Sequence, residues 1–169
     1  MLTTQRRSGR KPTRTKRCWS KKSKAGSRVV PPVDLHEWHE YAASAVCDGG
    51  IDRNPGGAMH WTVVVLDSSG ELVDARRVEP HEPPGYRSNN VAEFYAAIDA
   101  ARMLVPYAEG GGRTRIVTDS QVLVHAVRSR RSKRPHLQAL LGLLLEVLDR
   151  TGTKVVWAPR SLAVEFLGH

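Results

Sequence analysis

The sequence lacks most of the features that mark secreted, redox-active and membrane proteins. Its two cysteines, Cys18 and Cys47, are too few for a disulfide framework and do not form a CxxC pair. No segment resembles the apolar region of a secretory signal. The longest apolar run, at 140–148, is interrupted by Gly142 and Glu146 and is too short to cross a bilayer. The sequence therefore predicts a soluble, cytoplasmic protein with no membrane partner.

Acidic residues are also missing from the N-terminal region. Residues 1–28 contain 11 of the 26 Lys and Arg residues and no Asp or Glu, whereas the rest of the chain, with 15 basic and 17 acidic residues, is close to neutral. Such a basic arm is typical of contact with the phosphates of nucleic acid, although a solvated tail or a targeting peptide can have a similar composition. We expect residues 1–40 to be a disordered basic arm and linker that contacts a phosphate backbone.

Residues 41–169 have the pattern of a single folded domain. Short apolar runs between turn signals predict strands at 45–47, 61–66, 115–118 and 154–158, and a hairpin turn at 67–70 predicts that 72–78 returns as a fifth strand. Apolar spacing and capping signals predict helices at 88–105, 120–131 and 135–150, and a last segment starts at 161. This order of elements indicates an α/β fold, with a mixed sheet flanked by helices.

Three acidic residues lie beside apolar residues in these predicted elements. Asp48 and Asp119 each close an apolar strand, and Glu93 lies in the first turn of the long helix. A carboxylate in such a place is costly unless it is paired or binds metal, and oxygen ligands favour Mg²⁺ or Mn²⁺. Each residue alone has an ordinary explanation: Asp48 as the start of a turn, Glu93 as a charge on the helix dipole, and Asp119 as a helix N-cap.

The residues around the three carboxylates resemble the motifs of type 1 ribonucleases H. Residues 47–58 resemble the first strand and turn of that family. The sequence NNVAEFYAA at 89–97 resembles its NNxAE motif, TDSQ at 118–121 resembles its third motif, and WAPR at 157–160 is similar to the WVPR of one subgroup. The four motifs occur in the order that the family has, which is more specific than any one of them.

The resemblance implies a ribonuclease H-like fold, whose five-stranded mixed sheet has the order 3-2-1-4-5, and an endonuclease that hydrolyses the RNA strand of RNA/DNA hybrids. It implies that Asp48, Glu93 and Asp119 bind two Mg²⁺ ions, with Mn²⁺ as a substitute. These ions would activate a water molecule and stabilise the leaving oxygen.

The resemblance also implies contacts with the hybrid. Sensing the 2′-OH of the substrate at such contacts would distinguish RNA from DNA. Outside this resemblance, Asn54 fits a tight turn and Asn89 fits a helix cap equally well. The residues to which the resemblance assigns substrate binding are Gly49, Asn54, Asn89, Asn90 and Ser120.

The C-terminal region departs from the pattern of the family, which usually has a fourth carboxylate in its last helix. An alignment with a two-residue deletion assigns this position to Glu165, whereas an ungapped alignment assigns it to Leu167. We prefer Glu165 as the fourth catalytic and metal-binding residue, because Leu167 and Gly168 then also match. The loop histidine of some relatives is absent, and His169 is a weak candidate to replace it.

Two other functions fit the same residues. One is a nuclease of the same superfamily with another substrate, such as a junction resolvase, and the other is a hybrid-binding module whose fourth ligand has decayed. A basic cluster between the second and third helices offers further phosphate contacts in either case. This basic cluster consists of Arg128, Arg130, Arg131, Lys133 and Arg134. We expect the protein to be a monomer.

Overall fold

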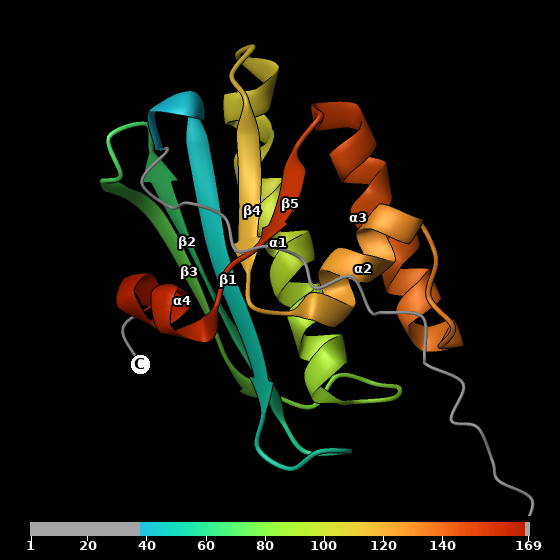
Figure 1. The fold of residues 1–169 in the computed structure, drawn as a ribbon. Helices are drawn as coiled ribbons and strands as arrows, with labels where there is room; N and C mark the ends of the chain where they lie inside the picture. Colours follow the sequence, from blue (N-terminus) through green and yellow to red (C-terminus); the bar gives the residue numbers. More distant parts are fainter. Residues whose placement is uncertain (1–37, 168–169) are drawn as a thin grey trace, which may run out of the picture.

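The computed structural model of the protein describes residues 38–167 (Figure 1). Its central sheet has the strand order β3-β2-β1-β4-β5. Strand β1 pairs antiparallel with β2 and parallel with β4, so the sheet is mixed and the predicted α/β class and strand order are confirmed. The elements are η1 (Trp38–Glu40), β1 (Ala43–Ile51), β2 (Met59–Asp67), β3 (Leu72–His81), α1 (Asn89–Glu109), β4 (Thr114–Thr118), α2 (Gln121–Ser129), α3 (Pro135–Thr151), β5 (Lys154–Trp157) and α4 (Arg160–Leu167).

Strand β1 is longer than its apolar run predicts. It continues through Asp48 and the following two glycines, which pair with Trp61 and His60 of β2. The prediction that Asp48 closes the strand is therefore wrong, because the glycine pair that resembles a turn is held extended by the neighbouring strand. Asp48 lies inside the sheet.

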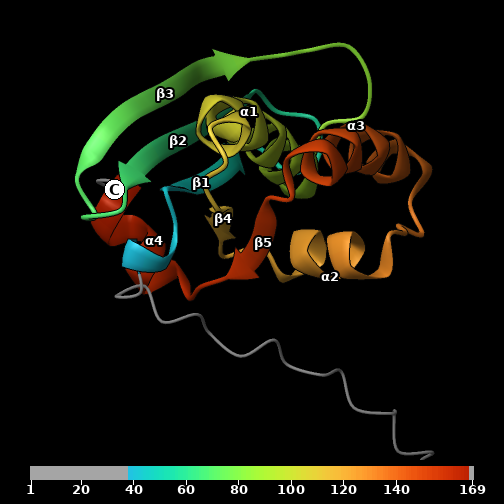
Figure 2. The same cartoon turned by 90° about the horizontal axis from the view of Figure 1, so that it is seen from above.

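The helices cover the two faces of the sheet unequally. Helices α1 and α3 lie on one face and α4 lies on the other (Figure 2). The face of α1 contains the larger core, which includes Cys47 of β1, whereas Val46 belongs to a smaller core beneath α4. Because side chains alternate along a strand, Asp48 is on the same face as Val46 and not on the face of α1.

The start of the described chain packs onto the face that α4 covers. The Trp38 ring contacts the ring of Phe166 edge to face, with 5.3 Å between centroids. Beneath it lies the buried Arg115, whose guanidinium stacks on the rings of Trp38 and Tyr41 and donates a hydrogen bond to Ser44. Trp38, which the sequence assigns to the linker, therefore packs on the folded domain. The rest of the predicted arm, residues 1–37, lies outside the described residues.

Helix ends differ from the predicted ones for local reasons. Ser88 caps α1 as expected, because its hydroxyl accepts a hydrogen bond from the N–H of Val91, and the helix then runs to Glu109 rather than to residue 105. Helix α2 ends at Ser129, two residues early, because Arg130 adopts a left-handed conformation with φ of 53°. Within residues 38–167, no helix combines the length and the apolar character that a membrane crossing requires.

Candidate active site

Glu93 reaches the site because α1 lies very close to β1. Gly49 makes this possible: a Cβ atom there would lie 2.4 Å from the carbonyl carbon of Ala92. Glu93 is the fifth residue of α1, so the prediction that it lies in the first turn is wrong. The helix dipole acts mainly on the first turn and does not account for a carboxylate at this position.

The two carboxylate oxygens of Glu93 are both hydrogen-bonded. Asn89 Nδ2 donates to Oε1 at 2.9 Å, and the Ser120 hydroxyl donates to Oε2. The same hydroxyl accepts from the N–H of Leu123 and caps α2. The end of β4, the start of α2 and the first turns of α1 therefore meet at Glu93.

Asp119 follows the last residue of β4. Because Ser120 is the N-cap of α2, the capping explanation for Asp119 does not apply. The backbone carbonyl of Asp119 accepts a hydrogen bond of 3.0 Å from the indole N–H of Trp157, the last residue of β5. The backbone at Asp119 is thus fixed from the neighbouring strand, and its side chain is half-buried.

Asp48 and Asp119 lie close enough to Glu93 for their charges to raise its pKa. Burial raises the pKa of Glu93 to about 7, and the charges of Asp119 and Asp48 add to this increase. Burial also raises the pKa of Asp119, with a further contribution from Asp48. The thiol of Cys47 has a raised pKa because it is buried, and all three carboxylates contribute. The structure therefore brings Asp48, Glu93 and Asp119 to one place.

Arg160, the first residue of α4, brings a positive charge to these groups. Its Nη2 lies 3.9 Å from Oδ2 of Asp48, and its charge opposes the rise in the pKa of Asp119. Sequence reasoning gave Arg160 no role beyond its place in the WAPR motif. Only the folded position of α4 shows that this cation lies beside Asp48, because nothing in the motif itself points to that residue.

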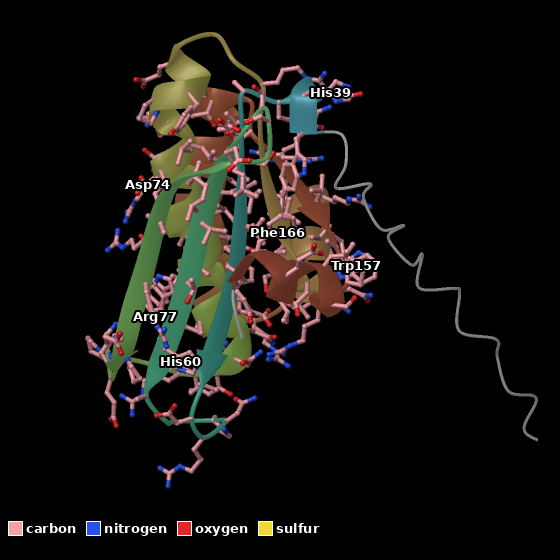
Figure 3. The ribbon with its side chains drawn as sticks, turned by 90° about the vertical axis from the view of Figure 1, so that its left-hand side faces the viewer. His39, His60, Asp74, Arg77, Trp157 and Phe166 are labelled. Carbon is pink, nitrogen blue, oxygen red and sulfur yellow. The ribbon has the colours of Figure 1, made fainter. Side chains whose placement is uncertain are left out.

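Two hollows meet at Arg160. One of about 400 Å³ is lined by Glu93, Asp119 and Ser120, together with the predicted contact residue Asn90. The other, of about 440 Å³, lies on the open face of the sheet beyond α4, where Figure 3 shows His60 and Arg77. Its other lining residues include Asp48, Gly49, Gly50, Thr62 and Asn89.

The remaining predicted site residues lie apart from the carboxylates. Asn54 is exposed in the turn between β1 and β2. Glu165 is exposed on α4, lines neither hollow, and is not among the charges that shift the pKa of Glu93 or Asp119. Leu167 packs against the smaller core. The structure does not bring Glu165 to the other three carboxylates, and His169 is outside the described residues.

Comparison with known proteins identifies the fold. No protein-family model and no curated protein matches the sequence. Solved structures do match. The N-terminal ribonuclease H domain of Rv2228c from Mycobacterium tuberculosis has a TM-score of 0.62 and 22% identity, over 73% of this chain and 86% of that chain. Ribonuclease H1 from Halobacterium salinarum has a TM-score of 0.62 and 21% identity, over 74% of this chain and 92% of that chain. The chain has the ribonuclease H fold. A ribonuclease H1 isolated from compost, solved in complex with an RNA/DNA hybrid, also matches. Its TM-score is 0.63 and its identity 22%, over 73% of this chain and 89% of that chain.

Within this ribonuclease H fold, the donor set of the three carboxylates fits a divalent cation. Their oxygens are the ligands that Mg²⁺ prefers, and the raised pKa of Glu93 shows an electrostatic cost that a cation would relieve. Among residues 38–167, however, no three His, Cys, Asp or Glu side chains already form a group that could hold a metal ion. Each oxygen of Glu93 already accepts one hydrogen bond, from Asn89 or Ser120, and each keeps a second lone pair that a cation could use.

Proposed function

We propose that this protein is a ribonuclease H, an endonuclease that hydrolyses the RNA strand of RNA/DNA hybrids with the help of divalent cations. One observation carries the proposal. The charges of Asp48 in β1 and Asp119 at the end of β4 both raise the pKa of Glu93 in α1, within a ribonuclease H fold. A hydrophobic core has no use for three converging carboxylates, whereas a cation-dependent phosphodiesterase requires them.

Each part of the site has a role in this chemistry. Asp48, Glu93 and Asp119 would hold two Mg²⁺ ions, with Mn²⁺ as a substitute; when bound, such ions supply an activated water molecule and neutralise charge on the leaving oxygen. Asn89 and Ser120 orient the Glu93 carboxylate, and Trp157 fixes the backbone of Asp119. Glu165 stays a candidate fourth ligand and would need a rearrangement of α4 to act as one.

The substrate contacts remain those that the sequence predicts. Asn54 is exposed, Asn89 and Asn90 are half-buried beside the carboxylates, and Gly49 and Ser120 line the two hollows. Amide side chains in these places suit the sugar edge of a hybrid, where the 2′-OH identifies RNA. We further propose that the basic N-terminal arm adds phosphate contacts without sequence preference, and that the protein acts as a cytoplasmic monomer.

A cleavage assay tests the proposal. The wild-type protein should cleave the labelled RNA strand of a hybrid in Mg²⁺ and should be inactive in EDTA. Asp48→Asn should reduce the rate by at least about 100-fold, because it removes a ligand charge while the fold is retained. Duplex DNA and a four-way DNA junction serve as alternative substrates. Cleavage of the junction but not of the hybrid would contradict the proposal and favour the resolvase function.

The position of Glu165 favours a second candidate, a module that binds hybrids but cleaves them weakly or not at all. In this case the protein would bind a hybrid tightly in both Mg²⁺ and Mn²⁺ without cutting it.

A Glu165→Gln variant separates two forms of the enzymatic function. An unchanged cleavage rate would indicate a site of three carboxylates, whereas a large loss would show that α4 moves to bring Glu165 to the cations.

A further inference from the structure

Arg87 connects two loops that come from different parts of the chain. Its Nη2 and Nε both donate to the carbonyl oxygen of Gly56, at 2.8 and 3.3 Å, and its Nη1 donates to the carbonyl oxygen of Pro83 at 3.3 Å. The Arg87 carbonyl in turn accepts from the N–H of Gly56 at 3.1 Å, and Glu82 pairs with the guanidinium at 3.0 Å. The loop before α1 and the turn after β1 are therefore joined in both directions.

The turn that Arg87 holds is itself a closed unit. The N–H of Asp52 bonds to the carbonyl of Ala58, and the N–H of Gly57 bonds to the carbonyl of Arg53 at 2.7 Å. Gly56, the residue that Arg87 holds, has a φ of +95°, a conformation that suits glycine. A turn closed in this way moves as one body, so a clamp on Gly56 also sets the position of the exposed Asn54.

The other end of the clamp lies at the start of α1. Arg87 precedes the N-cap Ser88, and Asn89 and Asn90 follow directly. The side chain of Arg87 is only 21% exposed, and its described partners are backbone carbonyls and one carboxylate rather than core residues. Its guanidinium is therefore turned inward, to the two loops, and is poorly placed to bind a ligand itself.

We propose that Arg87 is a positioning residue, which holds Asn54 in a fixed relation to Asn89 and Asn90 so that these residues form one preformed surface for the hybrid. The inference rests on the proposed function. Without the clamp, the turn is free to move and must be ordered when the hybrid binds. This ordering costs free energy and weakens binding, whereas the carboxylates that do the chemistry keep their places.

Three substitutions distinguish a clamp from a charge. Arg87→Gln removes both the fork of donors and the charge, and Arg87→Lys keeps the charge but cannot donate to two carbonyls in the same geometry. Arg102→Gln is the matched control, because Arg102 is an exposed arginine of α1 that pairs with Asp99. We would introduce each change into the Asp48→Asn protein and measure binding of a short fluorescein-labelled RNA/DNA hybrid by anisotropy in Mg²⁺.

The clamp predicts that both changes at Arg87 raise the Kd by about 10-fold and that Arg102→Gln leaves it unchanged. In otherwise wild-type protein, the changes at Arg87 should raise KM with little effect on kcat. Full affinity in Arg87→Lys would show that only the charge matters and would overturn the proposal. Unfolding of both Arg87 variants, seen by circular dichroism, would also overturn it, because Arg87 would then serve overall stability.

Failure of this inference can be told apart from failure of the proposed function. If the Asp48→Asn protein does not bind the hybrid and the wild-type protein does not cleave it, the proposed function fails. If the Asp48→Asn protein binds the hybrid and the wild-type protein cleaves it, but the Arg87 variants bind as tightly as their Asp48→Asn parent, only the proposed role of Arg87 is contradicted.

Discussion

At the scale of single residues, the folded site disfavours the ionised form of Glu93. Its pKa of about 7 arises from burial and from the neighbouring charges of Asp119 and Asp48, against the favourable hydrogen bonds from Ser120 and Asn89. The two hydrogen bonds do not remove the repulsion; they keep the carboxylate in place while the repulsion persists. A bound cation would relieve this repulsion.

Replacing Glu93 should therefore stabilise the protein without metal. The pKa of Glu93 is higher in the folded than in the unfolded state, so the folded protein binds more protons between about pH 4.5 and 7, and its stability falls as the pH rises through this window. In EDTA at pH 8, Glu93→Gln should raise the free energy of unfolding by about 2 kcal/mol, after allowance for partial exposure.

Urea denaturation at pH 8 and pH 4.5 measures this effect. The difference between the variant and the wild-type protein should nearly vanish at pH 4.5, where the carboxyl group is largely protonated in the folded state. Glu165→Gln, which changes an exposed carboxylate, is the control and should leave stability unchanged at both pH values. A Glu93→Gln protein less stable than wild type at pH 8 would show that no such cost exists.

At the scale of elements, the contact between α1 and β1 decides where Glu93 lies. Gly49 permits this contact because its missing side chain leaves room for the backbone of Ala92. Gly50, the next residue, faces the His60 ring instead: a Cβ there would lie 2.5 Å from Nε2 of that side chain. A methyl group at Gly49 would therefore meet fixed backbone, whereas one at Gly50 would meet a side chain that can move.

Gly49→Ala should separate α1 from β1. The added methyl group would meet the backbone of Ala92, and neither group can rotate to relieve the contact. We expect a loss of about 1–3 kcal/mol in stability and a large loss of hybrid cleavage as Glu93 shifts. Gly50→Ala should cost less stability, since the imidazole can move aside. Thermal denaturation and the cleavage assay measure both variants, and equal effects would contradict the role of the α1–β1 contact.

The same contact explains which elements could be predicted from the sequence. Apolar runs predicted four of the five strands, and the hairpin turn at 67–70 predicted β3, because these signals are local to each strand. The end of β1 was not predictable, because the pair Gly49–Gly50 has the local character of a turn and is extended only through pairing with β2. The end of α2 at Arg130 likewise depends on a backbone conformation that its sequence does not favour.

At the scale of the whole molecule, the face that α4 covers connects the start of the described chain to the site. Trp38 packs on Phe166 of α4 and stacks on the buried Arg115, and α4 begins with Arg160 beside Asp48. Sequence reasoning found the three carboxylates through their motifs. It missed this network because Trp38, Arg115 and Arg160 are distant in sequence and belong to no shared pattern. It preferred Glu165 over Leu167 as the fourth ligand on the alignment alone.

Trp38→Ala should loosen α4 without unfolding the sheet. The change removes the aromatic contact with Phe166 and exposes the Arg115 guanidinium, whereas the larger core on the face of α1 is untouched. Hydrogen exchange should become faster in α4 (Arg160–Leu167), with protection in β1 and α1 retained. Trp38→Phe, which keeps an aromatic ring, should have a smaller effect. Equal protection of α4 in all three proteins would contradict the link.

A calorimetric titration with Mn²⁺ tests whether Asp48, Glu93 and Asp119 form one cation-binding site. We predict that the wild-type protein binds Mn²⁺, that Asp48→Asn, Glu93→Gln and Asp119→Asn each weaken binding by at least about 10-fold, and that Arg102→Gln does not. Unchanged Mn²⁺ affinity in the three carboxylate variants, with their folds intact, would contradict the account.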